Sequence, residues 1–215
     1  MIRKPGEIFA PVSGSLSKTP ASTWQSYGAL FEKYSTSIVS PELLAALAQV
    51  ESDGNPFAGT YWLWQWSWNP FEIYRPASSA LGMFQLIDGT FAGARKYCIR
   101  DHKVATEDPK HGPASRRLNG LYTRMLASHA VELTAAYLHQ SVVNTLAARG
   151  TTKASPGQKE KLAAVIHLCG LKRGETFSAA GFRVTPGALC GTHSLQLYLG
   201  QIDLMKKQFA RLAGN

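Results

Sequence analysis

Apolar residues recur every three to four positions along several stretches of the chain, and this spacing predicts helices. The clearest stretch is SPELLAALAQVE at residues 40–51, where a serine and a proline precede the apolar run. Serine is a good N-cap and proline fits the first helical position, so the pattern predicts a helix that ends at or near Glu51. The other helices are predicted over residues 24–34, 88–98, 114–126, 128–148, 155–170 and 194–212.

The stretches between these helices are predicted as loops. Residues 1–22 carry three prolines and a Ser/Gly cluster, which is typical of an extended lead-in. The range 99–113 is polar with two prolines, and the range 171–191 is rich in glycine, so both are interpreted as loops. The chain shows no internal repeat and no run of β-branched residues. The fold class predicted for residues 23–215 is therefore all-α, in one compact domain.

The stretch GTYWLWQWSWNPFEIYRP at residues 59–76 holds four of the five tryptophans of the chain. In an extended chain residues two apart share a face, so Trp62, Trp64, Trp66 and Trp68 are expected on one side. Three interpretations remain open. The stretch is an aromatic flap packed over the helices, or a wall on which sugars stack, or a contact surface for a membrane or a protein.

Composition and charge limit the classes of partner. The 215 residues suffice for one domain with a real core, and 23 basic against 14 acidic residues leave a net charge of +9. A basic surface suits a polyanion such as nucleic acid, anionic lipid or an acidic cell-wall polymer, or it serves solubility alone. Because the lysines and arginines are scattered and form no basic arm, nucleic acid is not the expected partner.

Membrane segments and cross-links give weaker signals. No stretch approaches the ~20 apolar residues of a spanning helix, and no apolar run of a signal peptide follows the basic start. The protein is therefore expected either to be cytoplasmic or to have had a leader removed. Cys98, Cys169 and Cys190 permit either one disulfide with an odd thiol or three buried thiols. Their spacing matches no zinc pattern, so no metal site is predicted.

Glu51 is the first candidate for chemistry. A carboxyl group at a helix C-terminus lies in an unfavourable field, and apolar surroundings would raise its pKa further. A raised pKa would keep the group protonated near neutral pH, as a general acid requires. The alternative is an exposed glutamate at a frayed helix end.

The second candidate is the loop within SSALGMFQLIDGTF at residues 78–91. Gly82 would let the backbone approach a ligand closely, and Gln85 offers the amide donor and acceptor that recognition of a sugar or an N-acetyl group needs. Met83 and Phe84, between them, are either contacts of the ligand or residues of the core.

Four motifs in order resemble one known family. They are QVESDGNPFA at 49–58, SSALGMFQL at 78–86, AAYL at 135–138 and AAVIHLCG at 163–170. Together they resemble the soluble lytic transglycosylases of family 1 (SLT type), which share a catalytic core with goose-type lysozymes. The resemblance implies a lysozyme-like all-α domain in which Glu51 is catalytic.

The resemblance also implies which residues bind substrate. Ser52 follows the catalytic glutamate in the family, and the segment Gly82, Met83, Phe84 and Gln85 matches the Gly-x-x-Gln loop that lines the cleft. The chain departs from the family at the later helix, where histidine and leucine replace the usual tyrosine and asparagine. There His167 is expected either to donate a hydrogen bond to the glutamate or sugar, or to be a core histidine.

The implied reaction needs a single carboxyl group, no metal and no organic cofactor. Glu51 would protonate the glycosidic oxygen between N-acetylmuramic acid and N-acetylglucosamine, and then accept the C6 hydroxyl proton as a 1,6-anhydro ring closes. Ordinary glycosidases need a second carboxylate. Asp53 is the obvious one, although it would point about 200° away if the helix continued and is expected in a turn instead. Glu72 and Asp88 are further candidates without positional support.

Two rival functions remain: a muramidase that hydrolyses the same bond, and a non-catalytic wall-binding component of a secretion machine. The tryptophan-rich stretch connects Glu51 to the Gly82–Gln85 loop, so Trp66 and Trp68 are candidate sugar contacts beside the cleft. The expected partner is the glycan strand of peptidoglycan, with an envelope or secretion-apparatus partner as an open alternative. The protein is expected to be a monomer in the bacterial periplasm, a location inferred from the substrate alone.

Overall fold

The computed structural model describes residues 16–58, 62–64, 74–76, 80–106, 124–148, 150 and 153–214, and for 62–64 and 74–76 it describes the backbone alone. These residues form seven α-helices and three small two-stranded sheets. The helices are α2 (Pro20–Lys33), α3 (Pro41–Ser52), α4 (Asp88–Ala94), α7 (Ala127–Ala147), α8 (Pro156–Cys169), α9 (Leu171–Ala179) and α10 (Leu195–Ala213). The prediction of a mostly helical fold is confirmed.

Helix starts follow the predicted caps. The Ser40 side chain accepts a hydrogen bond from the backbone N–H of Leu43, and a complete capping box joins Ser155 and Gln158 at the start of α8. Helix α2 begins at Pro20, earlier than predicted and inside the expected lead-in, because the Thr19 side chain caps it. Local side-chain chemistry therefore determines where these helices begin.

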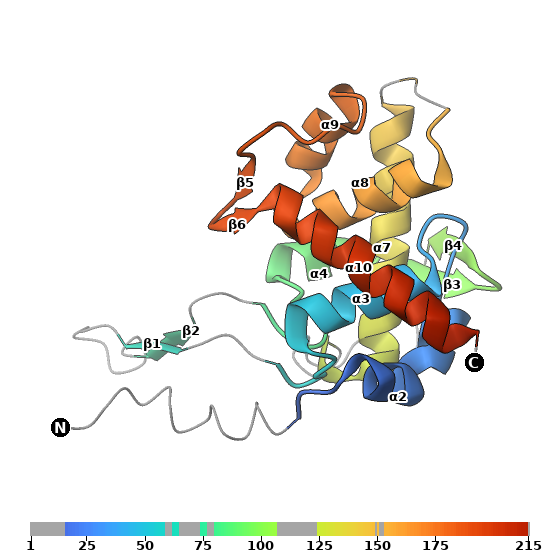
Figure 1. The fold of residues 1–215 in the computed structure, drawn as a ribbon, viewed down its shortest axis with the longest axis vertical. Helices are drawn as coiled ribbons and strands as arrows, with labels where there is room; N and C mark the ends of the chain where they lie inside the picture. Colours follow the sequence, from blue (N-terminus) through green and yellow to red (C-terminus); the bar gives the residue numbers. More distant parts are fainter. Residues whose placement is uncertain are drawn as a thin grey trace.

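Helix α3 lies at the centre of the hydrophobic core. Every residue from Leu43 to Ala48 is fully buried, so the helix is covered on all sides and not on one face alone. It packs against α2 and α10, while α8 packs against α7 and α9. In the view of Figure 1, α10 crosses in front of α3 and α7 runs behind it. The core thus holds α3 rigidly up to its last turn.

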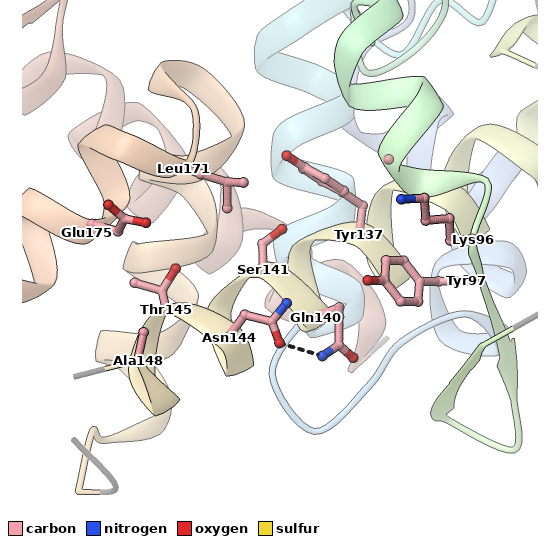
Figure 2. Close-up of a pocket in the computed structure, with 11 residues that line it drawn as sticks. Lys96, Tyr97, Tyr137, Gln140, Ser141, Asn144, Thr145, Ala148, Leu171 and Glu175 are labelled. Atoms are coloured by element: carbon pink, nitrogen blue, oxygen red, sulfur yellow. Dashed lines mark hydrogen bonds between the residues drawn. The ribbon is translucent and has the colours of Figure 1, made fainter. Parts of the chain in front are cut away.

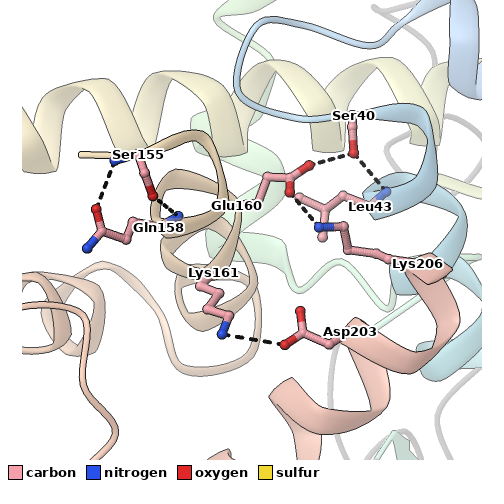
Figure 3. A network of polar contacts seen from close by, with 8 residues as sticks. All are labelled: Ser40, Leu43, Ser155, Gln158, Glu160, Lys161, Asp203 and Lys206. Atoms are coloured by element: carbon pink, nitrogen blue, oxygen red, sulfur yellow. Dashed lines mark hydrogen bonds and ion pairs between the residues drawn. The ribbon is translucent and has the colours of Figure 1, made fainter. Parts of the chain in front are cut away.

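A polar network ties the start of α3 to two other helices (Figure 3). Glu160 of α8 accepts hydrogen bonds from the Ser40 hydroxyl and from the Lys206 ammonium group of α10. All three side chains are half-buried, where a charge-assisted contact is stronger than at the surface. The network fixes α3, α8 and α10 relative to one another at one end of the bundle.

The predicted helix over 88–98 is wrong in its second half. Helix α4 ends at Ala94, and β3 (Tyr97–Arg100) pairs antiparallel with β4 (Lys103–Thr106) inside the predicted 99–113 loop. Asp101 and His102 both take positive φ angles, of 47° and 60°, which suit the two-residue turn of a hairpin. The sequence prediction missed this hairpin because its turn is Asp-His, and not the Asn-Gly pair that usually marks such a turn.

The predicted loop over 171–191 is also wrong, since it contains α9 and half of a hairpin, β5 (Leu189–Cys190) with β6 (His193–Ser194). Gly174 lies inside α9, and a Cβ atom there would stand 2.4 Å from Ile166 Cγ1. Glycine therefore serves close helix packing here and not a loop, at the usual cost in helix propensity.

The cysteine alternatives are resolved in favour of one bridge. Cys169 at the end of α8 forms a disulfide with Cys190 of β5, with Cα atoms 5.4 Å apart, and Cys98 is buried and takes no part in this bridge. The bridge fastens the β5–β6 hairpin to the end of α8.

In the tryptophan-rich stretch, β1 (Trp62–Trp64) pairs antiparallel with β2 (Tyr74–Pro76) (Figure 1). Trp66, Trp68 and the predicted 114–126 helix up to residue 123 lie outside the described residues. A sugar contact by these tryptophans therefore remains a prediction. Among the described residues, no helix has the length and apolar character needed to cross a membrane.

Candidate active site

Glu51 lies in the last turn of α3, where the buried helix reaches the surface. Its side chain is 18% exposed, so the alternative of a frayed, solvated glutamate is wrong. The helix ends because Asp53 takes a left-handed backbone conformation, with φ 51°, and Gly54 follows with φ 66°. The predicted turn at Asp53 is confirmed. It leaves the Glu51 carboxyl group in the last turn of a helix that the core holds in place.

Two side chains from other helices contact this carboxyl group. The Tyr198 hydroxyl of α10 donates a hydrogen bond to Glu51 Oε1 at 2.7 Å, and His167 Nε2 of α8 lies 3.5 Å from the same oxygen. The predicted contact between His167 and Glu51 is therefore present. These three residues lie on the three helices that the Glu160 network ties together, so the core and the network both position the site.

Sequence reasoning missed Tyr198. The residue lies 147 positions from Glu51 on a helix that the sequence shows only as amphipathic. Burial, and then the charge and hydrogen bond of Glu51, raise the pKa of Tyr198 well above its ordinary value. The phenol is therefore a neutral, permanent hydrogen-bond donor to the carboxylate.

The pKa of Glu51 is under opposing influences. Burial raises the pKa of this carboxyl group, whereas the hydrogen bond and charge of His167, the Tyr198 hydrogen bond and the charge of His193 lower it. The lowering contacts prevail, so the pKa of Glu51 lies below its ordinary value. The prediction of a raised pKa is wrong, because α8, α10 and the β5–β6 hairpin bring polar and cationic groups to a carboxylate that α3 alone would bury.

The Gly-x-x-Gln loop adjoins the end of α3. The Ser52 hydroxyl donates to the carbonyl of Met83 at 2.8 Å, and Gln85 Nε2 donates to the carbonyls of Gly82, at 2.9 Å, and Ala58, at 3.2 Å. Ser52 therefore joins the residue after Glu51 directly to the loop. The Gln85 amide is used largely to fold the loop on itself and to hold the chain that follows α3.

Three of the predicted substrate contacts have another role. The side chains of Met83 and Phe84 are completely buried in the core, so they do not reach a ligand, and the core alternative is correct for both. Gly82 approaches protein backbone and not an open ligand site, since a Cβ atom there would lie 2.2 Å from the carbonyl oxygen of Arg124. The loop supports the site through its backbone and its two anchors in the core.

The other three carboxylates that the sequence suggested each have a different position or role. Asp53 caps α3, and Asp88 is 71% exposed and pairs with Arg124 at 2.8 Å. Glu72 lies outside the described residues. The groups that shift the pKa of Glu51 within the described part of the chain are two histidines and a tyrosine, with no carboxylate among them. No cluster of potential metal ligands occurs in that part either.

A cavity of about 370 Å³ lies between α4 and β3 on one side and α9 on the other, with α7 beneath it (Figure 2). Its surface combines two tyrosine rings with amide and hydroxyl groups, a mixture suited to a neutral sugar. Its lining includes Lys96, Tyr97, Tyr137, Gln140, Ser141, Asn144, Thr145, Leu171 and Glu175. The AAYL motif thus contributes Tyr137 to the cavity. Gly93 lies beside the Tyr137 ring and has no side chain to occupy that space.

The two walls of this cavity continue from the elements that surround Glu51. Helix α9 begins at Leu171, just after the end of α8 that carries His167. Helix α4 begins at Asp88, three residues after Gln85. The cavity walls are therefore neighbours in sequence of the elements that carry His167 and the Gly82–Gln85 loop.

Glu51 is thus a partly buried glutamate at a helix end, in contact with a tyrosine and a histidine from two other helices. A family model for the transglycosylase SLT domain matches residues 29–145. The chain belongs to this family, which indicates a lytic transglycosylase acting on the peptidoglycan of the cell envelope. The helical fold agrees with the lysozyme-like fold expected for it. No curated protein and no solved structure matches the chain significantly.

Proposed function

We propose that this protein cleaves the β-1,4 bond between N-acetylmuramic acid and N-acetylglucosamine without water, with Glu51 as its one catalytic carboxyl group. The observation that carries the proposal is the environment of Glu51. It is nearly buried, and its contacts are Tyr198 and His167, with no carboxylate beside it among the described residues. Within the described part of the chain no carboxylate is among the contacts of Glu51, whereas ordinary glycosidases use two carboxylates.

The reaction runs in two steps on one residue. Glu51 donates its proton to the glycosidic oxygen, the bond to C1 of the muramoyl ring breaks, and the N-acetyl group of that ring stabilises the cationic centre. Glu51, now a carboxylate, accepts the proton of the C6 hydroxyl, whose oxygen closes onto C1. The products are a 1,6-anhydromuramoyl end and a free C4 hydroxyl, so Glu51 regains its proton and no water is consumed.

The lowered pKa of Glu51 favours the second step and opposes the first. A carboxylate that receives the Tyr198 hydrogen bond is a stable base in the free protein. A bound glycan excludes water from the site and so strengthens the burial that raises the pKa of Glu51. Protonation of Glu51 is therefore promoted by the substrate itself, and His167 at 3.5 Å offers a second position for the proton.

The glycan strand is proposed to run past Glu51 into the cavity above α7. The tyrosine rings and side-chain amides there fit sugar faces and N-acetyl groups (Figure 2). Trp66 and Trp68 are proposed as further sugar contacts, and the backbone of the Gly82–Gln85 loop as the support of the cleft. The periplasm as location and a monomeric state are also proposals, and the mechanism calls for no metal or organic cofactor.

The products of purified cell wall distinguish this reaction from hydrolysis. We expect mass spectrometry of the digest to show muropeptides with 1,6-anhydro ends. A hydrolytic muramidase would instead release reducing ends that are heavier by one water molecule, because water replaces the C6 hydroxyl as the attacking group. Reducing ends as the main product would refute the transglycosylase mechanism.

Tyr198→Phe is expected to move the pH dependence of kcat/KM to higher pH. The variant removes a donor that stabilises the charged form of Glu51, so the pKa of Glu51 rises towards its ordinary value. The general-acid step needs protonated Glu51, so the decline of activity with rising pH follows this pKa upward. Tyr27→Phe, on α2 away from the site, is the matched control and should leave the profile in place. A profile that stays fixed or moves to lower pH in Tyr198→Phe contradicts this role.

A further inference from the structure

A second cavity, of about 350 Å³, lies beneath the β5–β6 hairpin. It forms where the hairpin, the end of α8 and the first turns of α9 meet, and the disulfide belongs to its wall. The side chains that line it belong to Leu168, Cys169, Arg173, Leu189, Cys190 and His193. None of the residues that line this cavity is acidic, whereas two of them carry basic nitrogen groups.

Two elements of this cavity wall also act on Glu51. His193 lines the cavity and is close enough to lower the pKa of Glu51 by its charge. On the opposite wall Cys169 follows the Glu51 contact His167 by two residues, and its bridge to Cys190 holds both walls together. The cavity wall and the Glu51 contact His167 therefore share the end of α8.

Of the described residues that line this cavity, Arg173 is the one with a guanidinium group. Its Nη2 atom donates to the carbonyl of Leu189 at 3.1 Å, which holds the guanidinium group against the hairpin. Among the described residues this is the one hydrogen bond recorded for the Arg173 side chain, and its remaining N–H groups suit the two oxygens of a carboxylate. The apolar side chains of Leu168 and of Leu189, which is 54% exposed, border the same space.

We propose that this cavity binds a carboxylate of the acidic peptide stem that the muramic acid residue carries on its lactyl group. The proposal rests on the proposed function, which places a muramoyl residue at Glu51. A peptide of small apolar and acidic residues matches a cavity with a fixed guanidinium group, a histidine and two leucines. The β5–β6 hairpin then contacts the peptide stem of the sugar, while the cavity above α7 binds the glycan. The enzyme therefore prefers glycan strands that still bear peptides.

The test compares two substrates: soluble glycan strands with uncross-linked stems, and the same strands after an amidase has removed the stems and left the lactyl carboxylates. Wild-type protein is expected to show a kcat/KM about tenfold higher for the stem-bearing strands, as one charge-assisted contact provides. Arg173→Ala should lose this tenfold preference and cleave the stripped strands at nearly the wild-type rate. Arg173→Lys, which keeps the charge but not the planar fork, should retain part of the preference.

Lys172→Ala is the matched control, since Lys172 is an exposed cation on the same helix and lines neither cavity. It should keep the full preference for stems. The disulfide and the thermal transition of each variant are checked first, because Arg173 also holds the hairpin. The ratio of the two rates is the deciding readout, since a structural defect alone would lower both rates together.

Several outcomes would overturn the proposal. Equal rates of wild-type protein on both substrates exclude recognition of the stem. A loss in Arg173→Ala that is confined to the stripped strands assigns the cavity to the lactyl carboxylate instead, because only those strands carry that group free. An equal loss on both substrates rejects recognition of the stem and leaves Arg173 a structural role. If neither substrate yields anhydro ends, the proposed function fails, and the cavity is then tested by titrating the isolated stem peptide. Binding that Arg173→Ala abolishes supports the carboxylate site, and absence of binding rejects it.

Discussion

Glu51→Gln is expected to abolish the release of muropeptides from cell wall, with a fall in kcat of about 10³-fold or more. Glutamine cannot donate a proton to the glycosidic oxygen, and its amide cannot accept the C6 proton in the second step. The substitution removes both roles at once but keeps the shape of the side chain. Its carbonyl oxygen still accepts the Tyr198 hydrogen bond, so the fold should survive. Release is measured by mass spectrometry of the soluble fraction of a cell-wall digest.

Glu42→Gln is the matched control for this experiment. Glu42 lies in the first turn of the same helix, at the opposite end from the site, and should affect activity little. Circular dichroism and the thermal transition show whether each variant is folded. A folded Glu51→Gln protein that retains function would favour the rival interpretation of a non-catalytic wall-binding component.

Gly82→Ala is expected to destabilise the protein by about 2–4 kcal/mol. Gly82 has a φ angle of 77°, which an alanine adopts only with strain, and the added Cβ atom would lie 2.2 Å from the Arg124 carbonyl oxygen. Relief of this clash requires movement of backbone, and the following residues Met83 and Phe84 are anchored in the core. The expected loss is measured as the change in free energy of unfolding by denaturant titration.

Gly89→Ala is the control for the loss of a glycine. Gly89 lies in α4 with no atom within 4 Å of an added Cβ, so its replacement should change stability by less than about 1 kcal/mol, in the stabilising direction. A Gly82→Ala protein as stable as Gly89→Ala would show that the loop adapts to a side chain. The close approach to Arg124 would then be unnecessary for the fold.

The sequence alone determined the features that depend on neighbouring residues. The start of α3 at Ser40 and Pro41, the capping box of α8 and the end of α3 near Glu51 all follow from caps and apolar spacing within a few residues. Those signals, together with the order of four motifs, were enough to predict the helical class and the family, and they single out Glu51 as the candidate catalytic residue. Local hydrogen bonds and side-chain spacing act in the same way in any fold.

The tertiary structure alone decided what surrounds Glu51. Tyr198 reaches the carboxylate from a helix 147 residues away, and the charge of His193 reaches it from a hairpin that a disulfide holds in place. These contacts reverse the sign of the predicted pKa shift, because that prediction rested on the field at the helix end and on apolar surroundings alone. The roles of Gly82 and of Gly174 were hidden for the same reason. Each role depends on the distance between the glycine and an atom of another segment, and only the folding of the chain sets that distance.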